Sequence, residues 1–243
     1  MSRSTERRSS PIGNDQEGPA AERRKPSSPP TPPASLVLVH GAGSGPWIFE
    51  GWEAYFPGLE VKAVDLQAGL AVEDASMEDY AGNVVRACRS LSTPVSLCGW
   101  SMGGLVVLMA AADLKPHSVI LIEPSPPAEI QGRPEEVTPR PGAFDPQQVY
   151  GPFPPGVPSR LESGLARAQR KRGISVPVLG CPSLVVCGRD CRDERGPAVA
   201  RLYGSDLVEL PALDHWGLVL QDEPRQEISS FLGLADRRSP PGG

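Results

Sequence analysis

Histidine is scarce in this sequence, and long apolar runs are absent from it. The 243 residues contain three histidines, which lie far apart along the chain. Metal centres need several ligands at short, regular spacing, so this distribution predicts no metal site. No stretch approaches the roughly 18 consecutive apolar residues of a membrane-spanning helix, so we expect no membrane span.

Cysteine is also sparse and follows no recognisable pairing pattern. The five cysteines are an odd number, and none belongs to a C-x-x-C pair. This favours reduced thiols in a reducing compartment. The N-terminus lacks the apolar segment of a secretory signal, so we expect a cytoplasmic protein. A transit peptide stays open because the N-terminal segment is rich in Arg and Ser, although its acidic residues count against it.

The two ends of the chain have too few apolar residues to form a core. Residues 1–34 contain seven prolines and no aromatic residue, which is a composition typical of disorder. We expect the same of residues 236–243. The remaining segment, 35–235, has the length of one domain with a sizeable core. Because residues 1–34 carry a charge of +2 and the whole chain −5, the domain is acidic, which argues against nucleic acid as a partner.

Apolar, strand-like runs alternate with helical periods along this domain. The six runs that resemble strands are 35–40, 59–66, 94–98, 117–124, 181–187 and 206–213. We expect helices at 77–88, from 102 onward and at 223–234, and Ser76 with Asp79 forms a capping-box pattern before the first of them. This alternation predicts an α/β fold, with a mostly parallel sheet of about six strands and helices on both faces.

A long segment rich in Pro and Gly separates the fourth and fifth of these strands. It spans about 125–175 and contains one predicted helix, 158–172, but no strand pattern. Because it follows the end of a strand, it should emerge at the carboxyl edge of the sheet, where open α/β sheets bind ligands. We interpret this insertion as a lid.

The predicted lid helix has an apolar set and a basic set of side chains. Leu161, Leu165 and Ala168 share one helical face, which could close over a site. The basic set, which we interpret as a solvated face, consists of Arg167, Arg170, Lys171 and Arg172. Binding of an acidic substrate is the alternative role for this set.

One serine lies in a pattern that favours nucleophilic chemistry. The segment Gly99-Trp100-Ser101-Met102-Gly103 matches G-x-S-x-G, with an apolar run before it and a predicted helix after it. A sharp turn there would lift the Ser101 hydroxyl above the sheet edge and place it at a helix N-terminus. The glycines permit the strained backbone and close packing. Ser101 is therefore the candidate nucleophile, and it needs a base held by a third group.

His215 is the candidate base, because it follows the last predicted strand at the same sheet edge as Ser101. His40 lies in a glycine-rich loop, where histidine more often shapes the chain than transfers protons. His117 begins a strand, and we expect it at the surface or in packing.

An acidic residue near His215 would fix its tautomer and stabilise the imidazolium. Asp190 ends the strand that precedes that of His215, and it is our first choice. Asp193 lies three residues later, and Glu123 ends another strand, so both stay open as alternatives.

Four segments, in this order, resemble the α/β-hydrolase superfamily: LVHGAGSG, GWSMGG, VVCGRD and DHWG. The resemblance covers nearly all of the domain, from 35 to 234. Within the superfamily, HGAGSGPWIFEGW is similar to the first loop and helix of small esterases near the plant methylesterase and hydroxynitrile lyase group. The resemblance implies a triad of Ser101, Asp190 and His215, and an oxyanion hole formed by the backbone N–H groups of Ala42 and Met102.

The sequence departs from the family pattern in three places. The turn that ends at Asp190 is one residue shorter than the frequent G-x-x-D spacing, which keeps Asp193 open. Trp100 stands where many relatives have His, and together with Trp216 it flanks predicted catalytic residues and could form the pocket floor. Lys171 lies in a basic run, so the lysine that the lyases need gains no support.

These residues predict a cofactor-independent serine hydrolase that cleaves a small carboxylic ester through an acyl-enzyme on Ser101. Thioesterase, lactonase, C–C hydrolase, perhydrolase and lyase activities use the same triad and stay open, because substrate choice resides in the pocket. A non-catalytic ligand-binding protein on the same scaffold is the alternative from another class. A further alternative makes residues 1–34 an interaction module. The sequence does not indicate the oligomeric state.

Overall fold

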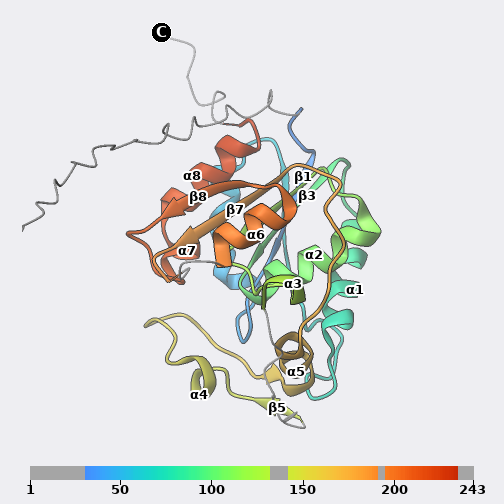
Figure 1. The fold of residues 1–243 in the computed structure, drawn as a ribbon, viewed down its shortest axis with the longest axis vertical. Coiled ribbons are helices and arrows are strands. Elements are labelled where there is room, and N and C mark those ends of the chain that lie inside the picture. The colour runs from blue at the N-terminus through green and yellow to red at the C-terminus, as the bar shows by residue number, and fades with distance from the viewer. Residues whose placement is uncertain (1–30, 132–141, 191–194, 235–243) are drawn as a thin grey trace, which may run out of the picture.

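A six-stranded parallel sheet forms the centre of the protein (Figure 1). The computed structural model describes residues 31–131, 142–190 and 195–234. The strands of the sheet are β1 (Ser35–Val39), β2 (Glu60–Val64), β3 (Val95–Trp100), β4 (Ser118–Ile122), β7 (Ser183–Gly188) and β8 (Asp206–Leu210). All six lie within the predicted runs or extend them by at most two residues, so the predicted α/β fold class is confirmed.

The strand order is β2-β1-β3-β4-β7-β8, and every neighbouring pair is parallel. In this register Gly99 of β3 lies opposite Val39 of β1 and Leu121 of β4. The chain segments that follow β1, β3 and β4 therefore leave the sheet side by side at its carboxyl edge. This edge is where the predicted site residues are to be sought.

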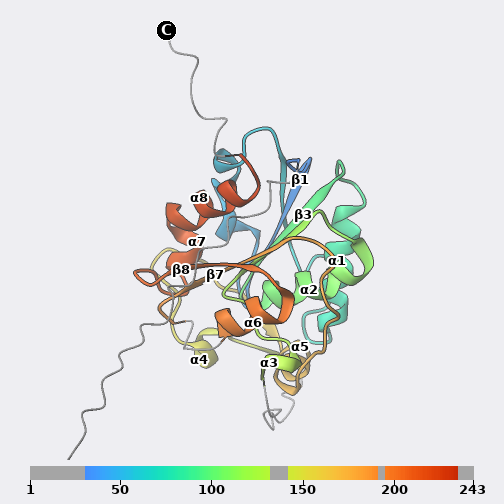
Figure 2. The ribbon, with the colours of Figure 1, turned by 45° about the horizontal axis from the view of Figure 1, so that its top comes forward.

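Helices cover both faces of the sheet, as Figures 1 and 2 show. One face packs against α1 (Met77–Cys88), α2 (Met102–Leu114) and α6 (Arg195–Tyr203), whereas the other packs against α7 (Gly217–Leu220), α8 (Asp222–Phe231) and the short 3-10 helices η1 (Pro46–Phe49) and η2 (Trp52–Tyr55). Alternate residues of β1 contribute to the two cores, with Val37 on the first face and Leu38 on the second. In the part of the chain that the structure describes, no helix has the length and apolar character needed to cross a bilayer.

The capping box predicted for α1 is present. The Ser76 side chain accepts a hydrogen bond from the Asp79 amide at 3.0 Å, and the Asp79 carboxylate accepts one from the Ser76 amide at 2.9 Å. Two N–H groups that the helix itself cannot satisfy are paired in this way. The start of α1 is therefore fixed by its own sequence.

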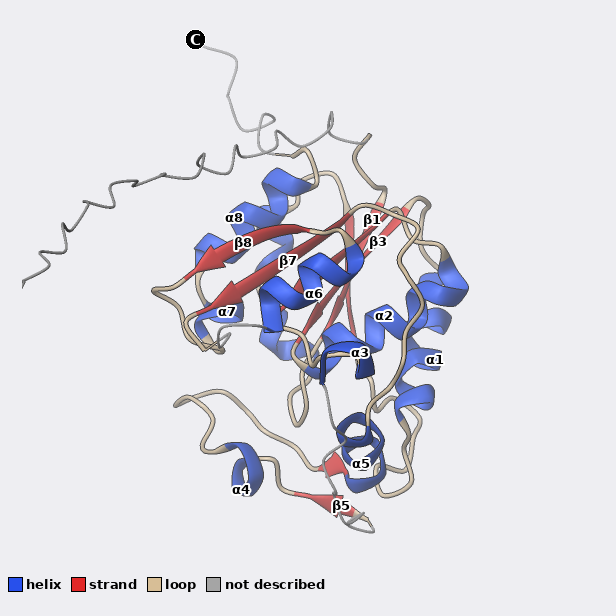
Figure 3. Cartoon of the chain, viewed as in Figure 1, coloured by secondary structure: helices blue, strands red, loops and turns tan. Residues whose placement is uncertain are grey.

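The insertion between β4 and β7 differs from its prediction. It contains α3 (Ala128–Gln131), α4 (Gln147–Tyr150) and α5 (Gly164–Arg172), together with the antiparallel pair β5 (Ala143–Phe144) and β6 (Glu162–Ser163). The predicted start of the helix at 158 was wrong by six residues, because the chain is extended up to Ser163, whose side chain caps α5 by accepting from the Ala166 amide at 3.1 Å. Figure 3 shows α4, α5 and β5 below the sheet, whereas α3 lies beside α2.

The end of the last helix and the two tails were also predicted from the sequence. Helix α8 ends at Phe231, three residues before its predicted end. The predicted tails lie outside the described residues, apart from 31–34, so their disorder stays a prediction.

Close packing at the start of α2 generates a prediction about stability. A Cβ atom at Gly103 would lie 2.2 Å from the carbonyl oxygen of Val39, whereas one at Gly82 of α1 would meet nothing within 4 Å. We expect Gly103→Ala to lower the free energy of unfolding by about 1–3 kcal/mol through overpacking. The control Gly82→Ala should raise it by about 0.5–1 kcal/mol, because Gly is unfavourable inside helices. Urea denaturation measures both; similar values for the two variants would contradict the packing argument.

Candidate active site

Ser101 occupies a strained turn between β3 and α2. Its φ is 56° and its ψ −121°, a conformation that is unfavourable for a residue with a Cβ atom. The neighbouring β4 segment holds this turn: the Ser101 amide donates to the Ile122 carbonyl at 3.0 Å, and the Ser125 amide donates to the Ser101 carbonyl at 2.8 Å. The sharp turn expected from the G-x-S-x-G pattern is therefore present.

Ser101 lines a cavity of about 500 Å³ at the carboxyl edge of the sheet. The residues predicted for the site that line it are Ala42, Trp100, Ser101, Asp190, His215 and Trp216. Met102 is buried, with 1% of its surface exposed, and its predicted role involves only its backbone N–H. The cavity thus brings together residues from β3 and from the loops that follow β1, β3, β7 and β8.

His215 is held in this cavity from two directions. Its ring lies 4.9 Å from that of Trp100, measured between centroids, and the Trp100 indole N–H donates to the His215 carbonyl at 3.1 Å. On the other side its Nδ1 atom is hydrogen-bonded to a carboxylate oxygen of Glu123. A carboxylate on Nδ1 leaves Nε2 as the atom that can accept a proton.

The carboxylate on His215 belongs to Glu123 and not to Asp190. The Glu123 side chain is 11% exposed, and its backbone is fixed by a hydrogen bond from its amide to the Val186 carbonyl at 2.8 Å. Asp190 also lines the cavity, but it is exposed, and among the described residues it forms no hydrogen bond or ion pair with His215. Asp193 lies outside those residues.

The strand order explains this difference from the first choice made on sequence. β4 is the immediate neighbour of β3, so Glu123, directly after β4, lies beside the Ser101 turn. The Arg189 amide, directly after β7, donates to the Leu213 carbonyl at 2.8 Å, which ties the end of β7 to the loop before His215. The sequence does show an acidic residue, Glu123, directly after an apolar run. It does not show where the corresponding strand lies in the sheet.

Ala42 and Met102, whose backbone N–H groups were predicted to form an oxyanion hole, both lie close to Ser101: Ala42 lines the same cavity, and Met102 is the next residue in the chain. Ala42 lies in the loop after β1, and Met102 is the first residue of α2. Neither amide donates to another group within the described part of the chain. An oxyanion hole requires donors that are not already paired in this way.

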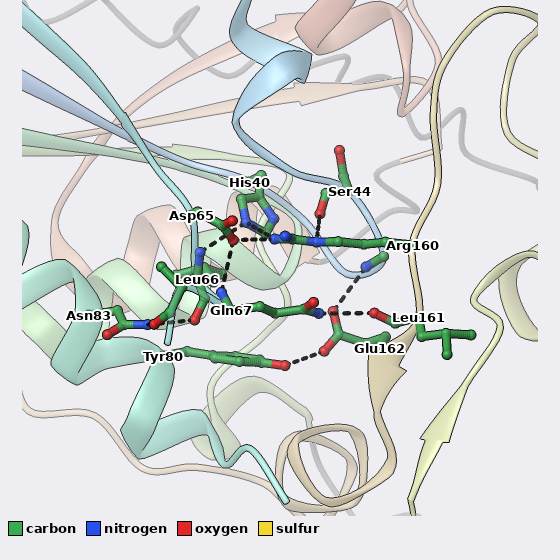
Figure 4. Close-up of polar contacts among 12 residues, drawn as sticks. His40, Ser44, Asp65, Leu66, Gln67, Tyr80, Asn83, Arg160, Leu161 and Glu162 are labelled. Atoms are coloured by element: carbon green, nitrogen blue, oxygen red, sulfur yellow. Dashed lines mark hydrogen bonds and ion pairs between the residues drawn. The ribbon is translucent and has the colours of Figure 1, made fainter. Parts of the chain in front are cut away.

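A partly buried polar network holds the loop that contains Ala42 (Figure 4). Arg160, from the insertion, donates to the Ser44 carbonyl at 2.8 Å, to Asp65 at 2.6 Å and to the Nε2 atom of His40 at 3.0 Å. Its amide also donates to the Gly43 carbonyl at 2.9 Å. The insertion thus fixes both sides of this loop.

Glu162 completes the network from the same segment. Its carboxylate accepts from the Gly43 amide at 2.9 Å and from the Tyr80 hydroxyl at 2.5 Å, and its residue surface is 1% exposed. Burial, together with the Glu162 charge, raises the pKa of Tyr80, so its hydroxyl stays protonated as a donor. No local sequence pattern indicated Arg160 and Glu162, because they lie in a Pro-rich stretch and their partners are distant in sequence.

His40 is structural, in agreement with its interpretation as a loop-shaping residue. It is fully buried; its Nε2 accepts from the Leu66 amide at 3.2 Å, and its Nδ1 is 2.9 Å from the Gly41 carbonyl. Burial lowers the pKa of His40 to about 4, and the Arg160 charge acts in the same direction, against the hydrogen bond to Gly41. The ring is therefore neutral at pH 7.

This lowered pKa predicts a loss of stability in mild acid. Between pH 7 and 5.5 the unfolded state binds a proton at residue 40 that the folded state does not bind. We expect the free energy of unfolding to fall by about 1 kcal/mol over this range through His40 alone. Urea denaturation at several pH values measures it. In His40→Gln the pH dependence should shrink by the same amount; an unchanged slope would contradict a neutral, buried His40.

Solved structures of hydrolases share this fold. A pyrethroid hydrolase from Sphingobium faniae has a TM-score of 0.60 at 20% identity, over 84% of this chain and 99% of that one. The RedJ thioesterase of prodiginine biosynthesis in Streptomyces coelicolor has a TM-score of 0.58 at 21% identity, over 82% and 88% of the respective chains. At these identities the likeness concerns the fold alone.

Comparison of sequences finds a relative with a higher identity than these structures. A pimeloyl-[acyl-carrier protein] methyl ester esterase from Aromatoleum aromaticum is 35% identical over 225 residues, with coverage of 84% of this chain and 80% of that protein. Residues 36–230 match the alpha/beta hydrolase family. This match includes all six strands of the sheet except Ser35, together with the Ser101 turn and His215, and the chain belongs to the alpha/beta hydrolase family.

Proposed function

We propose that this protein is a serine hydrolase that cleaves a small carboxylic ester through an acyl-enzyme on Ser101. The observation that carries the proposal is the Glu123–His215 pair, which lines the same cavity as the strained Ser101 turn. A nucleophile, a base and a group that orients the base are the three parts that such chemistry needs.

Ser101, His215 and Glu123 have distinct roles in the proposed reaction. Ser101 Oγ attacks the ester carbonyl while His215 Nε2 takes its proton, and Glu123 stabilises the resulting imidazolium through Nδ1. The amides of Ala42 and Met102 hold the oxyanion, where removal of one donor in comparable sites costs roughly 2.7–4 kcal/mol. His215 then protonates the departing alcohol, and water activated by the same base releases the acid.

Ester hydrolysis is favoured over the other reactions that use these residues. The relative from Aromatoleum aromaticum is a methyl ester esterase, and this supports a methyl ester of an acyl group as the first substrate class to test. We further propose that Trp100 and Trp216 form the pocket floor, because both line the cavity and their rings lie 4.9 Å apart. The insertion acts as the lid in this proposal.

The identity of the acid provides the experiment that tests the proposal. Glu123→Gln should lower kcat by about 10²–10⁴-fold, because His215 loses the carboxylate that fixes its tautomer. Asp190→Asn, the matched control, should stay within about threefold of the unaltered enzyme, since no bond to His215 is removed. Hydrolysis of p-nitrophenyl esters of graded acyl length measures both, with Ser101→Ala as the inactive baseline.

Two outcomes would count against the proposal. Full turnover in Ser101→Ala would remove the acyl-enzyme. A large loss in Asp190→Asn with little effect in Glu123→Gln would return the acid role to Asp190.

A further inference from the structure

Cationic side chains line the cavity that contains Ser101. They are Arg170 and Lys171 at the end of α5 and Arg195 at the start of α6. The two acidic residues of the described lining are Glu123, which is bonded to His215, and the exposed Asp190. The basic residues of α5 were predicted to form one solvated face. Two of them, Arg170 and Lys171, instead line the cavity.

Arg170 is fixed within this lining by neutral groups. It is half-buried, and its guanidinium donates to the hydroxyl oxygens of Ser125 at 3.0 Å and Tyr150 at 2.7 Å. The guanidinium carbon also lies 5.8 Å from the centroid of the Tyr150 ring, within the range of a cation–π contact. These contacts fix the orientation of the group without neutralising its charge.

The positive charge of Arg170 has no acidic partner among the described residues. Only two of the five N–H groups of a guanidinium are used by the hydroxyls, and its buried Nε has no hydrogen-bond partner. A charge that is partly removed from water is costly unless an opposite charge compensates it. An anion bound in the cavity would supply that compensation.

Arg170 is also connected to the nucleophile turn. Its partner Ser125 donates its backbone N–H to the Ser101 carbonyl at 2.8 Å. Arg170 therefore bonds directly to a residue that bonds to the nucleophile, and all three line one cavity. A molecule whose ester carbonyl lies at Ser101 would have its remaining atoms within that same cavity.

We infer that the substrate carries an anionic oxygen group, a carboxylate, and that Arg170 binds it while Ser101 attacks the ester. The substrate class is the monoester of a dicarboxylic acid. Arg170 is then a specificity-determining residue that discriminates charged from neutral esters. This inference rests on the proposed ester hydrolysis.

The test compares monomethyl glutarate with its terminal amide, methyl glutaramate, which has the same shape and no charge. Homologous pairs with four to eight carbon atoms in the acid cover different distances between the ester and the anion. Acid release, followed by titration at constant pH, gives kcat/KM for each. For the best chain length we expect a 10- to 100-fold preference for the charged ester, as for a hydrogen bond to a charged group.

Variants of α5 assign this preference. Arg170→Met should reduce the ratio of the two kcat/KM values to near one, and Arg170→Lys should retain part of it. Arg167→Met is the matched control, because Arg167 lies on the same helix over the Phe144 ring and does not line the cavity. It should keep the full ratio. If Arg170→Met does not fold, the ratio of kcat/KM for the charged ester to that for the neutral ester in Arg170→Lys decides whether Arg170 sets the preference.

Each outcome separates this inference from the proposed function. Equal rates for the two esters, or equal losses for both in Arg170→Met, would overturn the anion site and leave the hydrolase intact. If methyl 4-phosphonobutanoate is preferred over monomethyl glutarate, an anion is bound but the carboxylate assignment is wrong. If no ester is cleaved and a fluorophosphonate does not label Ser101, the proposed function fails, and the inference fails with it.

Discussion

The imidazole of His215 is fixed between the carboxylate of Glu123 and the indole of Trp100, and the arrangement of the site depends on this. Trp100 immediately precedes the nucleophile, and Glu123 follows the strand that pairs with β3. The hydrogen bonds that hold the Ser101 turn come from Ile122 and Ser125, on either side of Glu123. Ser101 and Glu123 thus lie at the ends of two adjacent strands, β3 and β4, and His215 is held against both strand ends. Distortion of one strand end would therefore disturb all three residues.

The insertion is joined to the site by more than proximity. Arg160 and Glu162 form hydrogen bonds to both the carbonyl and the amide of Gly43, in the loop whose Ala42 lines the cavity together with Ser101. Arg170, from the next helix, bonds to Ser125 on the other side of that turn. The insertion therefore contacts the two loops that flank Ser101, and changes within it can affect both the shape of the cavity and the position of a backbone donor.

The features that depend on neighbouring residues in the chain could be predicted from the sequence. The apolar runs of the six strands, the capping box at Ser76 and the G-x-S-x-G turn each depend on residues close together in the chain, and each is present. The acid could not be assigned in this way, because Glu123 and Asp190 both end strands and only the order of strands in the sheet distinguishes them. The start of α5 was misplaced for a similar reason, since Arg160 and Glu162 are held in extended chain by partners about 80 to 120 residues away. The predicted resemblance to small esterases near the plant methylesterase and hydroxynitrile lyase group, within the family, stays a prediction.

The central claim is that Glu123 orients His215 toward a nucleophile at Ser101, beside two backbone donors. A crystal structure of the protein after reaction with a p-nitrophenyl alkylphosphonate tests it most directly, because the tetrahedral adduct resembles the transition state. The account predicts phosphorus bonded to Ser101 Oγ, the phosphoryl oxygen within hydrogen-bonding distance of the Ala42 and Met102 amides, and His215 Nδ1 bonded to Glu123. An unmodified Ser101, or an adduct in which His215 has turned to Asp190, would contradict it.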